Sequence, residues 1–262
     1  MARPHDGAPA RRVGGCLVGA AKQLAQGVLV RSGYELQRVE DAREKQRLRA
    51  HASSIVERHR RQTLDDVNGL NAKYRGPIFG RVRVWDLFPV LARCIDPSDP
   101  EFGCVSQLTH TLQVIEGMRD DGVSDSDLLL CALIHDLGKV LLAGDEDPAN
   151  VGGLNAPIGV FEDGVGFDNC VFQWNHDEFA YSRFRHHVPD HVAWLIRYHS
   201  ARFELAEVQR LMDDRDKLYT ERYYRAFSRH DFSTKSIFGL PNTRIEDYRE
   251  LIESAFPHPI QF

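Results

Sequence analysis

The sequence predicts a nearly all-α protein. Beyond residue 74, apolar residues recur at three- and four-residue spacing, and Gly-, Pro- and Asn-rich breaks separate the segments that carry them. We find neither the apolar–polar alternation of a half-buried strand nor an internal repeat. With 262 residues, 42% of them hydrophobic, the chain can form one large domain, or one domain with an extension. We therefore expect a helical bundle.

The first sixty residues are expected to be an N-terminal extension. Residues 1–33 are basic, Gly/Ala-rich and poor in acid, and their short apolar part is interrupted by Lys22. This pattern favours a flexible or partly helical segment over a signal peptide. Residues 40–74 are strongly charged with a narrow apolar stripe, which predicts one long, mostly solvated helix lying on the domain; the stripe is Leu48, Ala52, Ile55 and Val56. We place the domain itself at residues 61–262.

Within the domain, the helices are expected in a regular succession. Ser106 is a candidate N-cap, and Ser124 with Asp127 three residues later has the form of a capping box before a helix that weakens near Gly138. A Gly/Pro/Asn-rich loop of about twenty residues at 147–166 is long for a compact domain, which indicates a functional role. The other expected helices lie at 84–94, 168–185, 189–199, 213–229 and 243–255.

Composition excludes several classes of partner. The formal charge of −5, from 33 basic and 38 acidic residues that are well mixed, gives no nucleic-acid footprint. No apolar stretch approaches the roughly 20 residues that span a bilayer. The five cysteines are scattered and odd in number, as expected for reduced thiols in the cytoplasm. We expect a cytoplasmic protein without nucleic-acid or membrane partners, and its mixed-charge surface is compatible with a monomer.

The segment CALIHDLGKV, residues 131–140, is the strongest sign of a metal site. His135 and Asp136 end an otherwise apolar helix, where both are costly to bury unless they are paired or bound to a cation. With His110 on the preceding helix and Asp231 far downstream, the order His, His-Asp, Asp is the ligand pattern of the HD-domain superfamily. Adjacent side chains project about 100° apart on a helix. Asp136 is therefore well placed to bridge two metal ions.

His176 and His199 are two further candidates. Each alone is more often a buried histidine that is hydrogen-bonded to a carbonyl. Taken with the other four residues, they complete six nitrogen and oxygen ligands, which can serve two metal ions with open positions. Imidazole and carboxylate ligands without thiolate favour iron or manganese over structural zinc.

Five segments, in order along the chain, resemble the metal-binding segments of the myo-inositol oxygenase family: SQLTHTLQVIEGMR, LIHDLGKVL, FDNCVFQWNHDEFAY, WLIRYHS and HDFSTKS. The resemblance runs from about Arg61 to the C-terminus. It implies an HD-domain-like helical bundle around a dinuclear site, in which a non-haem di-iron centre, Fe(II)/Fe(III), uses O2 as co-substrate. That centre cleaves a ring C–C bond of inositol to give D-glucuronate. The implied metal ligands are His110, His135, Asp136 as the bridge, His176, His199 and Asp231.

The same comparison bears on the substrate site, where a small polyol is expected. Lys139 and Lys235 each follow a metal ligand by four residues, one helical turn away on the same face, where they could meet anionic substrate oxygens. We predict both as catalytic and substrate-binding, although Lys235 could instead be a solvated charge near a helix end. Ser200, Asp96 and Asp99 match family positions near the polyol, and the two aspartates could equally be turn formers.

The chain departs from the family in the loop between Lys139 and His176, which is shorter. Where the family has Val-Gly-Asp, this chain reads Val151-Gly152-Gly153. A lost carboxylate removes a charge-assisted hydrogen bond to a hydroxyl, which is worth roughly 1.5–3 kcal/mol. Such a change can alter which polyol is accepted, so a related cyclitol stays open beside myo-inositol.

Two other functions fit parts of the pattern. An HD-type metal-dependent phosphohydrolase would use the same ligands to activate water and the lysines to bind phosphate, but the match around WNHDEF, RYHS and HDFSTKS favours the oxygenase. A non-catalytic relative is disfavoured, since all six ligand positions are intact. We expect Tyr223, Tyr224 and Phe227 to pack in the core, and the remaining histidines to lie at the surface; these are His5, His51, His59, His186, His187, His191, His230 and His258.

Overall fold

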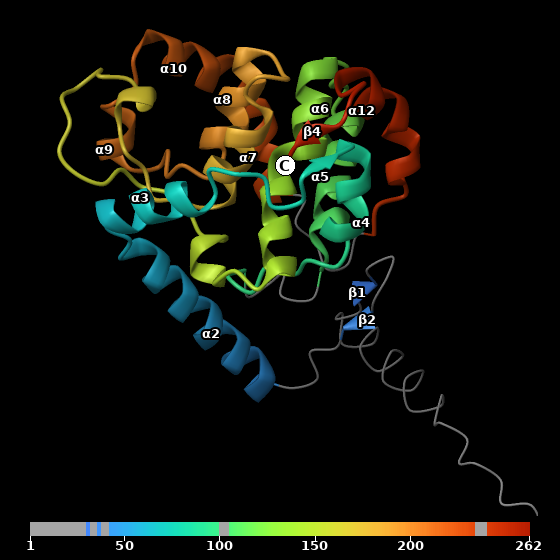
Figure 1. Ribbon diagram of the computed structural model, residues 1–262, viewed down its shortest axis with the longest axis horizontal. Helices are drawn as coiled ribbons and strands as arrows, with labels where there is room; N and C mark the ends of the chain where they lie inside the picture. Colours follow the sequence, from blue (N-terminus) through green and yellow to red (C-terminus); the bar gives the residue numbers. More distant parts are fainter. Residues whose placement is uncertain (1–29, 32–35, 38–41, 100–104, 234–239) are drawn as a thin grey trace, which may run out of the picture.

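The computed structural model describes residues 30–31, 36–37, 42–99, 105–233 and 240–262. Within these ranges the chain is a bundle of mostly short helices, so the all-α prediction is confirmed (Figure 1). Strands are limited to two short antiparallel pairs, β1 (Val30–Arg31) with β2 (Leu36–Gln37) and β3 (Arg81–Val82) with β4 (Ile260–Gln261). The second pair ties the C-terminus to the start of the bundle. Among the described helices, none is long and apolar enough to cross a membrane.

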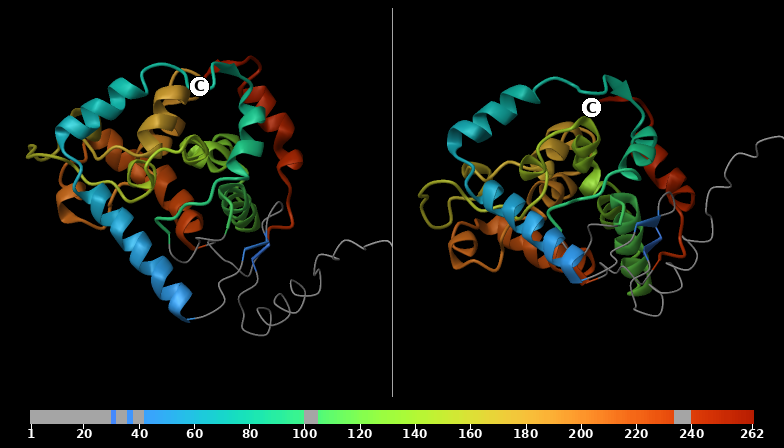
Figure 2. Two further views of the ribbon diagram at one scale, coloured as in Figure 1. Left: turned by 60° about the horizontal axis from the view of Figure 1, so that its bottom comes forward. Right: turned by 90° about the horizontal axis from the view of Figure 1, so that it is seen from below.

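The charged segment near the N-terminus forms two helices, α2 (Ala42–Arg60) and α3 (Leu64–Lys73), so the prediction of one long helix was wrong. Thr63 separates them because its side chain accepts the backbone N–H of Asp66, while the Asp66 carboxylate accepts the N–H of Thr63. The α2 helix runs along the outer edge of the bundle (Figure 2). Ala52 and Ile55, from the predicted apolar stripe, are buried. The boundary that we predict near residue 60 stays a prediction.

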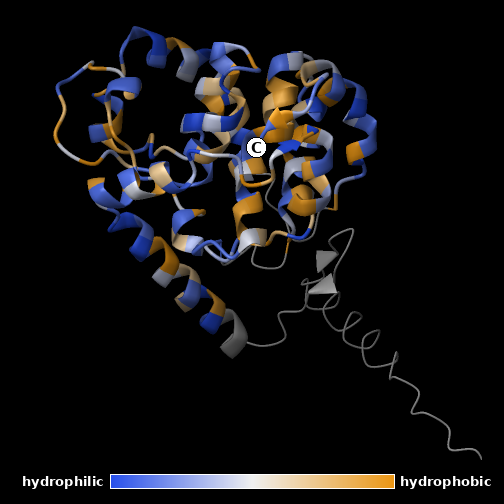
Figure 3. Cartoon of the chain, viewed as in Figure 1, coloured by the Kyte–Doolittle hydropathy of each residue, from blue (hydrophilic) through white to orange (hydrophobic). Residues whose placement is uncertain are grey.

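Five helices and one 3₁₀ helix hold the middle of the bundle, where apolar residues gather (Figure 3). They are α5 (Gln107–Asp120), α6 (Ser126–Ile134), the 3₁₀ helix η2 (His135–Gly144), α7 (His176–Phe184), α8 (Asp190–Tyr198) and α11 (Arg225–Ser233). Ser106 caps α5 as expected. The cap of α6 is Asp125, which accepts from the backbone N–H groups of Asp127 and Leu128, so Ser124 was the wrong residue.

The helix expected over 168–185 begins later than the sequence suggested. Gln173 and Ile158 donate their backbone N–H groups to Ala156 and Val171, which keeps the segment before α7 extended. Asn175 then caps α7 by accepting from the N–H of Asp177. Three other expected helices are also divided. The one over 84–94 becomes η1 (Val84–Leu87) and α4 (Phe88–Leu91), the one over 213–229 becomes α10 (Asp214–Tyr219), the π-helical turn η5 (Thr220–Tyr224) and the start of α11, and the one over 243–255 becomes η6 (Ile245–Tyr248) and α12 (Arg249–Ala255). Short helices outside these three are η3 (Pro148–Asn150), η4 (Phe167–Asn169) and α9 (Ala206–Gln209).

A close backbone contact sets the distance between η2 and α7. A Cβ atom placed on Gly138 would lie only 2.1 Å from the carbonyl oxygen of His176. Glycine therefore lets the segment with His135 and Asp136 approach the start of α7. Phe227, predicted as core, packs its ring against His135 with centroids 5.1 Å apart. These contacts place the buried polar residues of η2 and α7 inside an apolar shell.

Candidate metal centre and its pocket

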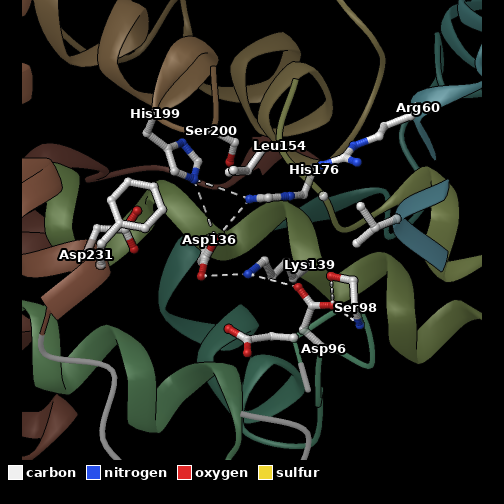
Figure 4. A pocket seen from close by; sticks show the side chains of 14 residues that line it. Arg60, Asp96, Ser98, Asp136, Lys139, Leu154, His176, His199, Ser200 and Asp231 are labelled. Carbon is white, nitrogen blue, oxygen red and sulfur yellow. Dashed lines mark hydrogen bonds and ion pairs between the residues drawn. The ribbon is translucent and has the colours of Figure 1, made fainter. Parts of the chain in front are cut away.

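Six residues that the sequence singled out as metal ligands meet in the interior. His110 comes from α5, His135 and Asp136 from η2, and His176 from α7. His199 is the C-cap of α8, and Asp231 lies on α11. All six are buried. Figure 4 shows Asp136, His176, His199 and Asp231 converging on one space.

The first group of donor atoms comprises His110 Nε2, His135 Nε2, Asp136 Oδ2 and Asp231 Oδ1. His110 Nε2 lies 2.9 Å from Asp231 Oδ1 and 3.6 Å from Asp136 Oδ2. His135 Nε2 lies 3.5 Å from Asp136 Oδ2 and 3.7 Å from Asp231 Oδ1. Ligand atoms about 2.1 Å from a common ion are separated by roughly 3 to 3.5 Å. This group therefore has the dimensions of a single-ion site.

The second group comprises His176 Nε2, His199 Nε2 and the other oxygen of Asp136. The two nitrogens are 3.3 Å apart, and Asp136 Oδ1 lies 3.0 Å from His176 Nε2 and 3.7 Å from His199 Nε2. Asp136 thus presents one carboxylate oxygen to each group. This is the arrangement of a bridging carboxylate.

Hydrogen bonds orient three of the histidines. A backbone carbonyl can only accept, so a ring nitrogen beside it must carry a proton; in the neutral ring, the form that binds a metal ion, the other nitrogen then keeps its lone pair. In each of His135, His176 and His199, Nδ1 donates to a carbonyl and Nε2 faces the centre. The acceptors are Ala132 O at 2.9 Å, Val151 O at 2.6 Å and Ile196 O at 2.9 Å, respectively. Such outer hydrogen bonds are typical of metal-binding histidines.

The charge of the centre also fits bound cations. His135 Nε2 is buried and has no hydrogen-bond partner within the described part of the chain, which is unusual for a buried polar atom. Burial lowers the pKa of His135, but Asp136 and Asp231 outweigh burial and raise that pKa to about 10. Burial likewise lowers the pKa of His176, whereas Asp177 and Asp136 raise it to about 9. The carboxylates therefore hold the histidines ready for a positive charge, whether a proton or a metal ion.

Lys139 lies at the edge of the centre and is almost fully buried. Its Nζ is 3.1 Å from Asp136 Oδ2 and 3.2 Å from Asp96 Oδ2 (Figure 4). It also donates a 3.0 Å hydrogen bond to Gln107 Oε1. Burial lowers the pKa of Lys139, but Asp136 and Asp96 raise it above its ordinary value. Lys139 is therefore a fixed cation.

A pocket of about 300 Å³ opens onto this centre. This volume is at the low end for small-molecule sites. The predicted substrate residues Asp96, Asp99, Lys139, Gly153 and Ser200 line it, beside four of the metal-ligand candidates. Asp96 also accepts from Ser98 N at 2.9 Å and Ser98 Oγ at 2.6 Å, so it serves as a turn former as well.

Within the described part of the chain, one predicted substrate residue stands apart from this lining. Gly152 lies behind Ser98, because a Cβ atom there would meet Ser98 Oγ at 2.2 Å. Lys235 lies outside the described residues, so its role stays a prediction.

The structure adds residues that sequence reasoning missed. Asp177 contacts His176, Gln107 accepts a hydrogen bond from Lys139, and Arg60 lines the pocket. Only Asp177 could have been noticed in the sequence, because it repeats the His-Asp pair. His59 and His230 were predicted to be exposed and are buried. His59 Nδ1 lies 3.0 Å from Ala149 O and its Nε2 lies 3.1 Å from Asn155 Oδ1, contacts across some ninety residues that no local pattern reveals.

Comparison with known proteins gives a consistent result. The family model described as myo-inositol oxygenase matches residues 49–153 and 145–262. The chain is 28% identical over 242 residues to a protein named probable inositol oxygenase of Oryza sativa subsp. japonica, which covers 78% of each chain. It is 26% identical over 242 residues to inositol oxygenase 1 of Arabidopsis thaliana, with 78% of this chain and 77% of that protein covered. It is 26% identical over 213 residues to inositol oxygenase of Bos taurus, with 68% and 74% covered.

Proposed function

The chain belongs to the myo-inositol oxygenase family, and we propose that it uses O2 to cleave a ring C–C bond of myo-inositol or a closely related cyclitol. The protein is an oxygenase, and its product from myo-inositol is D-glucuronate together with water. The polyol supplies every electron that reduces O2, so no external reductant takes part. The observation that carries this proposal is the two sets of His/Asp donor atoms that share Asp136, beside a pocket that Lys139, Asp96 and Asp99 help to line.

We assign two iron ions to this centre. His110, His135 and Asp231 would hold one ion, His176 and His199 the other, and Asp136 would bridge them, as the distances between the donor atoms indicate. The donor set supports iron because it combines imidazole and carboxylate without thiolate. Bound there, iron supplies electron transfer to O2 and the Lewis acidity that lowers the pKa of a coordinated hydroxyl.

The protein's own groups bind and orient the polyol. The Lys139 ammonium is charged and held between Asp96 and Gln107, so it can stabilise an anionic substrate oxygen without first reorganising. Asp99 and Ser200, on the pocket wall, supply polar groups for further hydroxyls. Because its partners fix it, Lys139 also orients the substrate relative to the centre.

The test is oxygen uptake by anaerobically iron-loaded, partly reduced protein, with and without myo-inositol. We expect one O2 consumed for each glucuronate formed, and no uptake by metal-free protein. Uptake with a substituted cyclitol but not with myo-inositol would change the substrate and keep the reaction. The comparisons do not favour the phosphohydrolase; phosphate release from esters, without O2 uptake on any polyol, would restore it and refute our proposal.

A further inference from the structure

Arg60 places a second positive charge at the pocket, besides that of Lys139. It belongs to the last turn of α2 and lines the pocket beside Val56 of the same helix and Leu154 of the long loop. Figure 4 shows Arg60 at the edge of the pocket, well apart from Lys139, which lies next to Asp136. Nothing in the reaction of a neutral polyol requires a cation at this edge.

Arg60 differs from the other two arginines at the end of α2. Arg58 forms an ion pair with Asp147, and Arg61 Nη2 lies 2.7 Å from Glu57 Oε1. Neither of these two arginines is among the residues that line the pocket. Arg60 does line it, is exposed, and has no ion pair or side-chain hydrogen bond within the described ranges of the chain. Its guanidinium is therefore available to a ligand.

The aspartates of the metal centre face other charges. Asp96 Oδ2 and Asp136 Oδ2 lie 3.2 Å and 3.1 Å from Lys139 Nζ, and Asp231 Oδ1 lies 2.9 Å from His110 Nε2. A neutral cyclitol bound in this pocket would leave the Arg60 guanidinium to solvent. A phosphate or carboxylate on the ring would instead accept two parallel N–H···O bonds from it, the geometry for which a guanidinium is suited.

The backbone that carries Arg60 is held against the segment that leads into α7. The Arg60 carbonyl accepts the Gln173 side-chain amide at 3.1 Å. Gln62 accepts the Trp174 backbone N–H at 2.7 Å and donates to the Trp174 carbonyl at 2.9 Å. These contacts lie two and three residues before His176, so they set the position of Arg60 relative to the metal centre. Only the Arg60 side chain has to be ordered when a ligand binds, which limits the entropic cost.

We propose that the pocket binds a cyclitol with a small anionic substituent, phosphate or carboxylate, and that Arg60 pairs with this group. The inference rests on the cyclitol site of the proposed function and narrows its substrate class. A volume of about 300 Å³ admits a ring with a small substituent only. The substituent itself does not react. The C–C bond between two CH–OH carbons breaks, one carbon becomes an aldehyde and the other a carboxylic acid, and O2 gives one oxygen atom to the acid and one to water.

The test measures ligand affinity apart from turnover. Anaerobic calorimetry on the iron-loaded protein compares myo-inositol with myo-inositol 1-phosphate and with quinate, a cyclitol carboxylate. At least one of the two anions should bind at least about tenfold more tightly than myo-inositol, the lower end for a hydrogen bond to a charged group because Arg60 is exposed. The anion that is preferred identifies the substituent as phosphate or carboxylate. In Arg60→Met, which keeps an apolar stem, this preference should fall about tenfold.

Arg61→Met is the matched control, since it removes the same charge from the neighbouring position outside the pocket, and it should keep the preference. Equal affinities for all three ligands would overturn the inference. So would a preference that survives in Arg60→Met, because the metal ions or Lys139 would then hold the anion. Arg60→Gln takes the place of Arg60→Met if that variant does not fold.

Oxygen uptake with the same ligands separates this inference from the proposed function. A preference that depends on Arg60, without O2 uptake on any of the ligands, would refute the oxygenase and leave the inference standing. Stoichiometric O2 uptake with myo-inositol, together with equal affinities for the three ligands, would do the reverse.

Discussion

Replacing Gly138 with alanine tests whether the contact between η2 and α7 holds the metal centre together. The added Cβ would lie 2.1 Å from the carbonyl oxygen of His176, 2.8 Å from its carbonyl carbon and 3.0 Å from its Cα. Ordinary van der Waals contact begins at 3.4 Å. Both partners are backbone, so no side chain can turn away, and the two segments must separate by more than about 1 Å.

The expected loss of stability follows from that displacement. Overpacking in a well-packed interior typically costs about 1–3 kcal/mol, and a backbone-to-backbone clash belongs at the upper end. Alanine's better helix propensity offsets at most about 1 kcal/mol of this. We therefore expect the free energy of unfolding to fall by about 2 kcal/mol. Because His176 moves with its backbone, the second metal ion should be lost even from molecules that fold.

Gly144→Ala is the control, because Gly144 ends the same 3₁₀ helix and a Cβ there would meet nothing within 4 Å. Its free energy of unfolding should change by no more than about 0.5 kcal/mol. Urea titrations of the metal-free proteins compare stability, and anaerobic Fe(II) titrations compare metal content. If Gly138→Ala matched Gly144→Ala in both, the close approach of η2 to α7 would have no role in building the centre.

Further predictions concern the pocket and its surroundings. Lys139→Met should lower kcat for O2 uptake by about 100-fold while two ions still bind, because a preorganised cation is lost; unchanged kcat would refute its role. Gly153→Asp should lower the free energy of unfolding by about 2 kcal/mol, since residue 153 has φ +96° and a Cβ there meets the His59 ring at 2.7 Å; full stability in urea would refute the clash. Burial raises the pKa of Glu146, but contacts from Asn150, Lys73 and Tyr74 lower it below the ordinary 4.5. Its stabilisation is therefore present above about pH 4.5 and lost as pH falls below that value. The excess stability of the unaltered protein over Glu146→Gln should shrink between pH 6 and pH 3, and a constant difference would contradict this sign.

The sequence predicted the parts of the centre whose signal is local. His135 and Asp136 were recognisable because polar residues at the end of an apolar helix need partners, and Ser106 because a cap has a fixed relation to its helix. Asp177 was not recognised, because a carboxylate in the first turn of a helix is common for electrostatic reasons alone. Only its distances to His176 Nε2 and His199 Nε2 distinguish it.

The burial of His59 could not be predicted for a different reason. Its partners at Ala149 and Asn155 belong to the long Gly-rich loop, and no pattern near residue 59 refers to them. A charged helix with a narrow apolar stripe is expected to be solvated, and most of α2 is exposed. Its last turn instead enters the structure of the loop that borders the pocket.

The position of the His59 ring against the loop explains why residue 153 is a glycine. Glycine is favoured at position 153, because the backbone φ there is +96° and the Cβ of any other residue would clash with the His59 ring. The aspartate that the resemblance led us to expect is absent where α2 packs against the loop. Val56 and Arg60 of α2 line the same pocket, and Figure 4 shows Arg60 at its edge. One wall of the pocket thus lacks the expected aspartate at position 153, and carries an arginine. Because the metal-ligand candidates lie on other helices, a change in this wall can alter which cyclitol is bound while the metal centre stays the same.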